Sequence, residues 1–335
     1  MRATESRVYT LRPFAGAQAP AAAPGLSKRH IRRNTLLCHT GSSLHQLKQS
    51  DPQFDKTSSK VPPRGKIREF SAKARQRMRL DLARVNQNKA GKALFATLTY
   101  PAAFPWDYRE FKAHLAKFGK RFVYYFPNGA FHWKLEFQKR DAPHFHPIFW
   151  NVPVGTGKEM QRFRAWVAEN WYEVVGSGDV RHLRAGTSVE LMRSQMAIMR
   201  YCAGYLSDTD QTRPGQSVGR YWGVVGREKI PYGKPVEVEL SDDEYQLILR
   251  TARRWMRSCN RVRRIKHAEK FAPHMTNDYL SGRYRRLRKG APFMNCFKFT
   301  PRKMRLNNNR NLNLFCNADQ WATYWERICE LAARL

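Results

Sequence analysis

Residues 130–151 read AFHWKLEFQKRDAPHFHPIFWN, and this stretch decides the fold. Polar and apolar side chains alternate along its first half, which is the period of a strand with one buried face. A short polar turn over residues 139–143 separates that half from a second, more apolar strand. The stretch therefore predicts an antiparallel hairpin, with one strand over 130–138 and the other over 144–151.

The second strand of this hairpin carries two histidines. Residues two apart in a strand point to the same face, so His144 and His146 project together, about 7 Å apart at Cα. Two imidazoles at that spacing can share one metal ion. The hairpin brings Glu136 or Gln138 beside them as an oxygen ligand. The alternative is a pair of half-exposed histidines without a ligand, but the flanking prolines and the nearby carboxylate favour the metal site.

The elements around the hairpin predict an α+β fold. A strand is expected over 92–100, and Asp107 caps a helix with apolar residues at helical spacing. Further elements are expected as a helix over 158–175, an extended segment over 180–191 and a helix from about 194 to 207. The order β-α-β-β-α-β-α is close to the ferredoxin-like arrangement, also seen in RNA-recognition domains, in which helices back a central antiparallel sheet.

The two ends of the chain differ from this middle part. Residues 1–60 show little periodicity and are predicted to be mostly disordered. A basic amphipathic helix between Lys60 and Lys89 leads into a domain over 61–226. Residues 227–335 form a basic, mostly helical C-terminal region. Within it, residues 250–310 hold 19 Lys and Arg against two acids.

Charge restricts the class of partner. The 335 residues include 61 Lys and Arg and 27 Asp and Glu, a net charge of +34, which indicates a polyanion and first of all nucleic acid. An anionic membrane surface is the second choice. No run approaches the ~20 apolar residues of a membrane span and no secretory signal opens the chain, so a cytoplasmic location is expected. The candidate nucleic-acid-binding residues are Arg140, Arg220, Trp222, Arg254, Arg257 and Arg264.

Two tyrosines form the second chemical signal. Tyr201 and Tyr205 are four residues apart in a predicted helix, so both phenols lie on one face. Beside a metal ion they would serve as nucleophiles. The alternative is an aromatic stripe that packs on the sheet.

These motifs together resemble the HUH single-strand endonucleases. The resemblance rests on PHFHPIF at 143–149, FATLTY at 95–100 and the tyrosine pair. Three other segments, GKIREFS at 65–71, EFQKRDAPH at 136–144 and GRYWG at 219–223, are similar to rolling-circle replication initiators of filamentous phages and related plasmids. The resemblance covers about residues 64–226.

The resemblance implies a metal-dependent enzyme that nicks and rejoins single-stranded DNA at an origin. His144, His146 and Glu136 would hold one Mg²⁺ or Mn²⁺, and Tyr201 and Tyr205 would form 5′-phosphotyrosine links. Relatives carry a lysine three positions after each tyrosine, where this chain has Gly204 and Asp208. The implied location is a bacterial host cytoplasm.

Other readings of the sequence remain open. A transposase or conjugative relaxase would use the same chemistry, although the chain has no phosphate-binding loop of a helicase part. A non-catalytic nucleic-acid binder on a ferredoxin-like sheet would need neither motif. A mononuclear iron oxygenase would leave the charge and the tyrosines unexplained. The expected partner is single-stranded origin DNA, with duplex DNA at the C-terminal region and a host helicase as further candidates.

Overall fold

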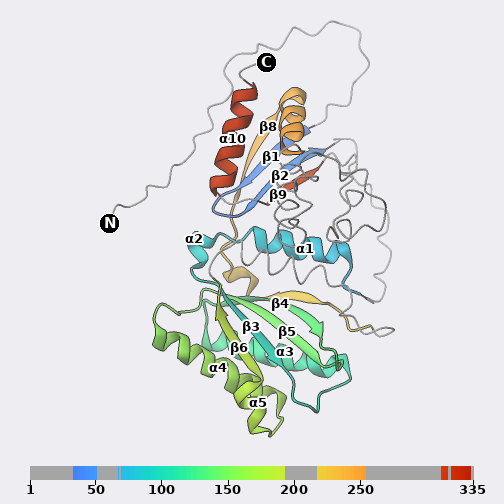
Figure 1. The fold of residues 1–335 in the computed structure, drawn as a ribbon, viewed down its shortest axis with the longest axis vertical. Coiled ribbons are helices and arrows are strands. Elements are labelled where there is room, and N and C mark those ends of the chain that lie inside the picture. Colours follow the sequence, from blue (N-terminus) through green and yellow to red (C-terminus); the bar gives the residue numbers. More distant parts are fainter. Residues whose placement is uncertain are drawn as a thin grey trace, which may run out of the picture.

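The computed structural model describes residues 33–50, 67, 69–192, 217–253, 311–315 and 318–332 (Figure 1). Two antiparallel sheets with helices packed on them confirm the predicted α+β class. One sheet has five strands in the order β6-β3-β5-β4-β7, and the other has four in the order β8-β1-β2-β9. In Figure 1 the helix α1 lies between the two sheets.

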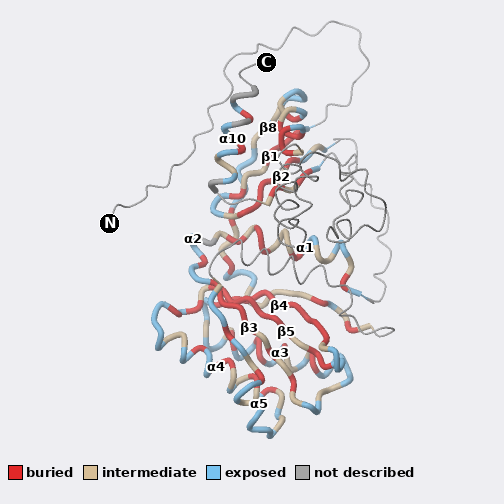
Figure 2. The backbone as a smooth tube through the Cα atoms, viewed as in Figure 1, coloured by how far each residue is buried: buried red, intermediate tan, exposed pale blue. Residues whose placement is uncertain are grey.

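The five-stranded sheet contains the predicted hairpin. Its strands are β3 (Leu94–Thr99), β4 (Ala130–Phe137), β5 (Pro143–Trp150), β6 (Thr187–Leu191) and β7 (Trp222–Val225). β4 and β5 pair along their whole length, from Ala130 opposite Trp150 to Phe137 opposite Pro143. Asp141 takes a left-handed backbone conformation, with φ of 62°, in the turn between them. Figure 2 shows that buried residues are concentrated on β3, β4 and β5.

Helices cover one face of this sheet. They are α3 (Tyr108–Tyr125), α4 (Gly157–Val175) and the short α5 (Val180–Ala185). The side chain of Asp107 accepts from the Arg109 N–H and begins α3 as predicted. The apolar stripe of α3 is buried, and its rings pack on rings of β4 and β5, as in the pairs Phe111–Phe145 and Phe122–Phe131.

The other face of the sheet meets α1 (Ala72–Ala83), which is followed by α2 (Gln87–Ala90). Ser71 caps α1, and the predicted basic amphipathic helix is found here with Met78 and Leu82 buried. Polar side chains of β4 and β5 lie on this α1 side, where the histidines are found.

The four-stranded sheet was not predicted. It consists of β1 (Arg33–His39), β2 (Leu44–Ser50), β8 (Pro235–Leu240) and β9 (Leu312–Phe315). A helix over 242–253 and α10 (Ala318–Ala332) pack on it through a second apolar core. The expectation that residues 1–60 are mostly disordered is therefore wrong for residues 33–50. The C-terminal region also contributes strands to this sheet, besides its helices.

The segment 180–191 also differs from expectation. It was predicted to be extended, but Asp179 caps the helix α5, and only the residues after Gly186 form the strand β6. The Asp179 carboxylate accepts from the Arg181 N–H, a local interaction that favours a helical turn. A 3₁₀ turn, η1 (Arg227–Lys229), follows β7. The helix expected over 194–207 lies outside the described residues.

Candidate metal and nucleic-acid site

The two histidines share one face of β5, as predicted, and this face is on the α1 side of the sheet. β5 places His144 and His146 on one face with their rings stacked and the ring centroids 4.5 Å apart. In the hairpin register, Glu136 lies opposite His144 and Lys134 lies opposite His146. Directly opposite residues of an antiparallel pair share a face, so these four side chains gather in one cluster.

Glu136 is the centre of this cluster. Its Oε2 accepts from His146 Nε2 at 3.2 Å, and its Oε1 accepts from the ammonium group of Lys134. All three side chains are buried. Burial by itself would raise the pKa of Glu136, but the hydrogen bonds and charges of His146 and Lys134 hold this pKa below its usual value. The carboxylate is therefore ionised at neutral pH.

β3 supplies the second contact of His146. The ring stacks on Phe95 with centroids 5.4 Å apart, and its Nδ1 lies 3.4 Å from Thr97 Oγ1. In a neutral His146 that donates from Nε2 to Glu136, Nδ1 accepts from the Thr97 hydroxyl. Binding of a metal ion at Nε2 would require the proton to move to Nδ1, which could then donate to Thr97 Oγ1. The sequence predicted a strand over 92–100 but did not assign Thr97 to the site. The available signal was the strand period, which places Thr97 and Thr99 on one face of an otherwise apolar strand.

His144 has a different environment. Its Nε2 is buried and has no hydrogen-bond partner within the described residues. Burial lowers the pKa of His144 to about 4, and the nearby His146 and Arg140 lower it further while Glu136 opposes them. The imidazole is neutral at pH 7, and a neutral imidazole with an unused nitrogen is the form that binds a metal ion.

The donor set has the chemistry that a divalent cation requires. It comprises two imidazoles and one carboxylate on one face of a hairpin. Among the residues that the structure describes, however, no group of three His, Cys, Asp or Glu side chains is already arranged to hold a metal ion. Lys134 binds one oxygen of Glu136, so that oxygen must turn from the ammonium group before it can serve as the third ligand.

The central part of the chain is similar to a known protein family. Residues 93–210 match the family of replication-associated protein ORF2, the replication initiators of filamentous phages. The resemblance to replication initiators is thus confirmed for this range, which is about a third of the chain. No curated protein and no solved structure gives a significant match.

The matched segment, residues 93–210, contains the whole histidine cluster. It begins one residue before β3 and includes Glu136, His144 and His146. It also includes positions 201 and 205. Tyr201 and Tyr205 lie outside the described residues, as do Gly204 and Asp208. Their distance from the histidines therefore stays a prediction.

Arg140 has a structural role in the matched segment. Its guanidinium donates to the backbone oxygens of Tyr100 and Pro101 and to Oε1 of Gln138. It also lies over the Phe104 ring, with Cζ 5.4 Å from the ring centroid. These contacts tie the β4–β5 turn to the loop after β3. They also occupy the amide oxygen of Gln138, which leaves Glu136 as the better placed candidate ligand.

The other candidate nucleic-acid-binding residues fall into two groups. Trp222 is half-buried and lies opposite Lys134 in the register of β7 and β4, so it extends the row of side chains that includes His146. Arg220 is exposed, and its carbonyl accepts from Lys112. Arg254, Arg257 and Arg264 lie outside the described residues. The neighbouring Tyr221 is buried against Phe70, which favours core packing over base stacking for that residue.

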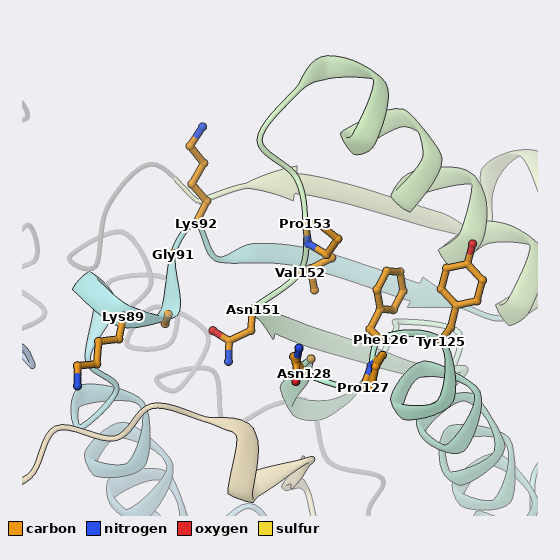
Figure 3. Close-up of a pocket in the computed structure, with 12 residues that line it drawn as sticks. Lys89, Gly91, Lys92, Tyr125, Phe126, Pro127, Asn128, Asn151, Val152 and Pro153 are labelled. Atoms are coloured by element: carbon orange, nitrogen blue, oxygen red, sulfur yellow. The ribbon is translucent and has the colours of Figure 1, made fainter.

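A pocket of about 500 Å³ lies at the opposite end of the hairpin (Figure 3). It opens where β5 has ended, at Asn151 and Val152, about 17 Å along the strand from His146 at 3.4 Å per residue. No histidine, cysteine or acid lines it. The pocket is therefore separate from the histidine cluster.

No helix in the described parts of the chain is long and apolar enough to cross a membrane.

Proposed function

We propose that this protein is a replication initiator that nicks and rejoins single-stranded DNA at an origin. The proposal rests chiefly on one observation, the histidine pair with Glu136 opposite His144 and hydrogen-bonded to His146. The match of residues 93–210 to replication-associated proteins and the net charge of +34 support it. The same match favours replication over a transposase or a relaxase, which would share the chemistry.

The reaction would be a transesterification at one phosphodiester. The phenolic oxygen of Tyr201 or Tyr205 forms a bond to phosphorus and loses its proton, and the bond to the 3′ oxygen breaks. The 3′ oxygen leaves as a hydroxyl, and the tyrosine keeps a 5′-phosphate ester. Rejoining is the reverse step and needs no nucleotide cofactor. With two tyrosines, the second can cut the regenerated origin while the first still holds the old end.

The cluster would prepare the phosphate for attack. His144, His146 and Glu136 would hold one Mg²⁺ or Mn²⁺, which when bound polarises the scissile phosphate and offsets its growing negative charge. His144 offers a neutral nitrogen and Glu136 an ionised carboxylate, the protonation states that such ligands require. Lys134 would neutralise Glu136 until the cation enters.

The DNA contacts are part of the same proposal. Single-stranded DNA would cross the α1 side of the sheet beside Trp222, while Arg140 would shape the loop after β3. The C-terminal arginines Arg254, Arg257 and Arg264 would bind phosphates of duplex DNA. Recruitment of a host helicase would follow from the proposed role.

A covalent-adduct assay tests the function. Purified protein is incubated with circular single-stranded DNA and MnCl₂, with or without EDTA, and separated on a denaturing protein gel. We expect a metal-dependent adduct that is absent from His146→Ala and from the double variant Tyr201→Phe/Tyr205→Phe. Tyr124→Phe is the matched control, because Tyr124 is 89% exposed on α3, outside the cluster.

The two single variants, Tyr201→Phe and Tyr205→Phe, show which phenol forms the adduct. An adduct in one and not in the other would identify the main nucleophile. If wild-type protein binds DNA tightly and no adduct forms under any metal condition, the nicking proposal is wrong. The protein would then be a non-catalytic nucleic-acid binder.

A further inference from the structure

The pocket at the far end of the hairpin has the composition of a nucleotide site. Its lining contains two lysines, two aromatic rings and two asparagines, but no acid. Its volume of about 500 Å³ lies within the usual range for sites that bind small organic groups. A pocket with cations and no anions selects a negatively charged ligand, and the aromatic rings offer a surface on which a base can stack.

The two kinds of side chain occupy different ends of the pocket. In Figure 3, Tyr125 and Phe126 stand at one end, and Lys89 and Lys92 extend outward from the other, with Asn128 and Asn151 between. Phe126 packs on Trp166 and Phe163, so its ring is held in place at the base of the pocket. Tyr125 is 62% exposed and leaves much of its ring to solvent.

The dipole of helix α3 indicates which end of the pocket would take the base and which would take the phosphate. α3 ends at Tyr125, where its last carbonyl groups carry partial negative charge. A phosphate is disfavoured at that end, whereas a neutral base is tolerated and can donate hydrogen bonds to carbonyl oxygens. The lysines at the opposite end attract the phosphate. Base and phosphate therefore have one preferred direction in the pocket.

The backbone around the pocket is held in a specific shape. Asn151 has φ of 56°, one of two non-glycine residues with positive φ within the described residues. Its side-chain Nδ2 donates to the Lys229 carbonyl at 2.7 Å, which stabilises this uncommon conformation. Gly91 also has positive φ, and a Cβ there would meet no atom within 4 Å. The wall beside Lys92 is consequently open enough for a ligand to approach the backbone.

We propose that this pocket binds one nucleotide of single-stranded DNA, with its base on Tyr125 and its phosphate near Lys89 and Lys92. This inference rests on the proposed single-stranded DNA substrate. Asn151 at the pocket lies about 17 Å from His146 along β5, whereas Tyr125 ends α3 on the other face of the sheet, so the DNA strand would have to pass around this end of the sheet to reach both places. The site would anchor the DNA a few nucleotides from the bond that is cut.

Binding of a fluorescein-labelled oligothymidylate, followed by fluorescence anisotropy, tests the proposal on the full chain. Tyr125→Ala should weaken binding about tenfold, the scale of losing one stacked base, and Tyr125→Phe should retain wild-type affinity. Tyr124→Ala is the matched control, since Tyr124 is the adjacent and more exposed tyrosine but does not line the pocket. It should change the affinity less than twofold.

Salt dependence separates phosphate binding from stacking. The double variant Lys89→Ala/Lys92→Ala should lower the slope of log affinity against log salt by about 0.7 for each phosphate that the protein no longer neutralises, whereas Tyr125→Ala should leave the slope unchanged. Photocrosslinking with 5-iododeoxyuridine in the oligonucleotide should label Tyr125 and not Tyr124. Equal affinities of Tyr125→Ala and Tyr124→Ala, with no crosslink at Tyr125, would overturn the proposal.

These measurements do not depend on nicking. If the covalent adduct forms normally while Tyr125→Ala binds as wild type does, the pocket inference is wrong and the proposed function stands. If no adduct forms but Tyr125→Ala loses affinity, the nicking proposal is wrong and the pocket remains a site for single-stranded DNA.

Discussion

His132 donates from Nε2 to Oδ2 of Asp81 at 2.9 Å and thereby connects β4 to α1. The direction of this hydrogen bond follows from the other ring nitrogen. Nδ1 of His132 accepts from the indole N–H of Trp150 at 2.8 Å, and an indole can only donate. His132 is fully buried, and burial lowers its pKa, so the ring stays neutral. Asp81 also accepts from Tyr232 and Arg227, so three side chains donate to its carboxylate.

We expect Asp81→Asn to destabilise the protein by about 2–3 kcal/mol, because a buried network loses the charge that its donors require. Urea unfolding followed by circular dichroism measures the change in the free energy of unfolding. Arg227→Ala is the control, since its side chain is 53% exposed and the ion pair is worth at most about 1 kcal/mol. Equal losses of unfolding free energy in both variants would show that the buried His132–Asp81 hydrogen bond contributes no more to stability than the exposed ion pair of Arg227.

The pH dependence of stability should have a component from His45. Its ring stacks on Trp321 with centroids 3.6 Å apart, and burial, with a smaller effect of His39, lowers the pKa of His45 to about 3. The unfolded chain binds a proton near pH 6.5 and the folded chain does not. This group therefore removes stability as the pH falls from about 6.5 to about 3, by up to about 1.4 kcal/mol per pH unit.

His45→Phe keeps a ring against Trp321 and removes the titration. The difference in unfolding free energy between wild type and His45→Phe, measured by urea unfolding at several pH values, should grow as the pH falls within this window. It should be constant above about pH 7.5, where the histidine is neutral in both states. A difference that does not depend on pH would contradict the prediction.

Four strands of the five-stranded sheet were predicted because their signals are local, whereas the short strand β7 was not predicted. The alternation around Lys134 and Glu136 and the cap at Asp107 depend only on neighbours in the sequence. In the four-stranded sheet, β1 and β2 form a local hairpin with a turn at Gly41, a signal that was missed. Their outer edges pair with strands 200 or more residues away, as in the pairing of Thr35 with Glu239, so their short segments alone favoured disorder.

The candidate site was predictable in part for the same reason. The strand period and the hairpin turn place both histidines and Glu136 on one face. The period cannot show which side chains bind each other, so the ion pair of Lys134 with Glu136 and the contact of Thr97 with His146 were missed. Arg140 was expected to bind nucleic acid on the basis of its charge. Its contacts with Tyr100 and Pro101 depend on a loop whose path the sequence does not specify.

Thr97→Val should weaken metal binding about tenfold, because a ligand imidazole loses the group that fixes its orientation. Isothermal titration with MnCl₂ measures the affinity, and the adduct assay should show the same loss at limiting metal. Thr99→Val is the control, since Thr99 is on the same strand opposite His144 but makes its described hydrogen bonds through its backbone. If the two variants bind Mn²⁺ equally, Thr97 does not orient His146.

Lys134→Met tests whether Glu136 is the third metal ligand. The variant leaves a buried carboxylate without its cation, so the free energy of unfolding without metal should fall by about 3 kcal/mol. Mn²⁺ should bind more tightly than in wild type, because it no longer competes with the ammonium group for Glu136, and it should restore much of the lost stability.

Lys112→Met provides the comparison, since Lys112 lies over the Trp133 and Phe145 rings on the other face of the sheet. Its Mn²⁺ affinity should equal that of wild type. If Lys134→Met leaves the Mn²⁺ affinity unchanged or lower, Glu136 does not bind the metal and the two histidines must find their third ligand elsewhere.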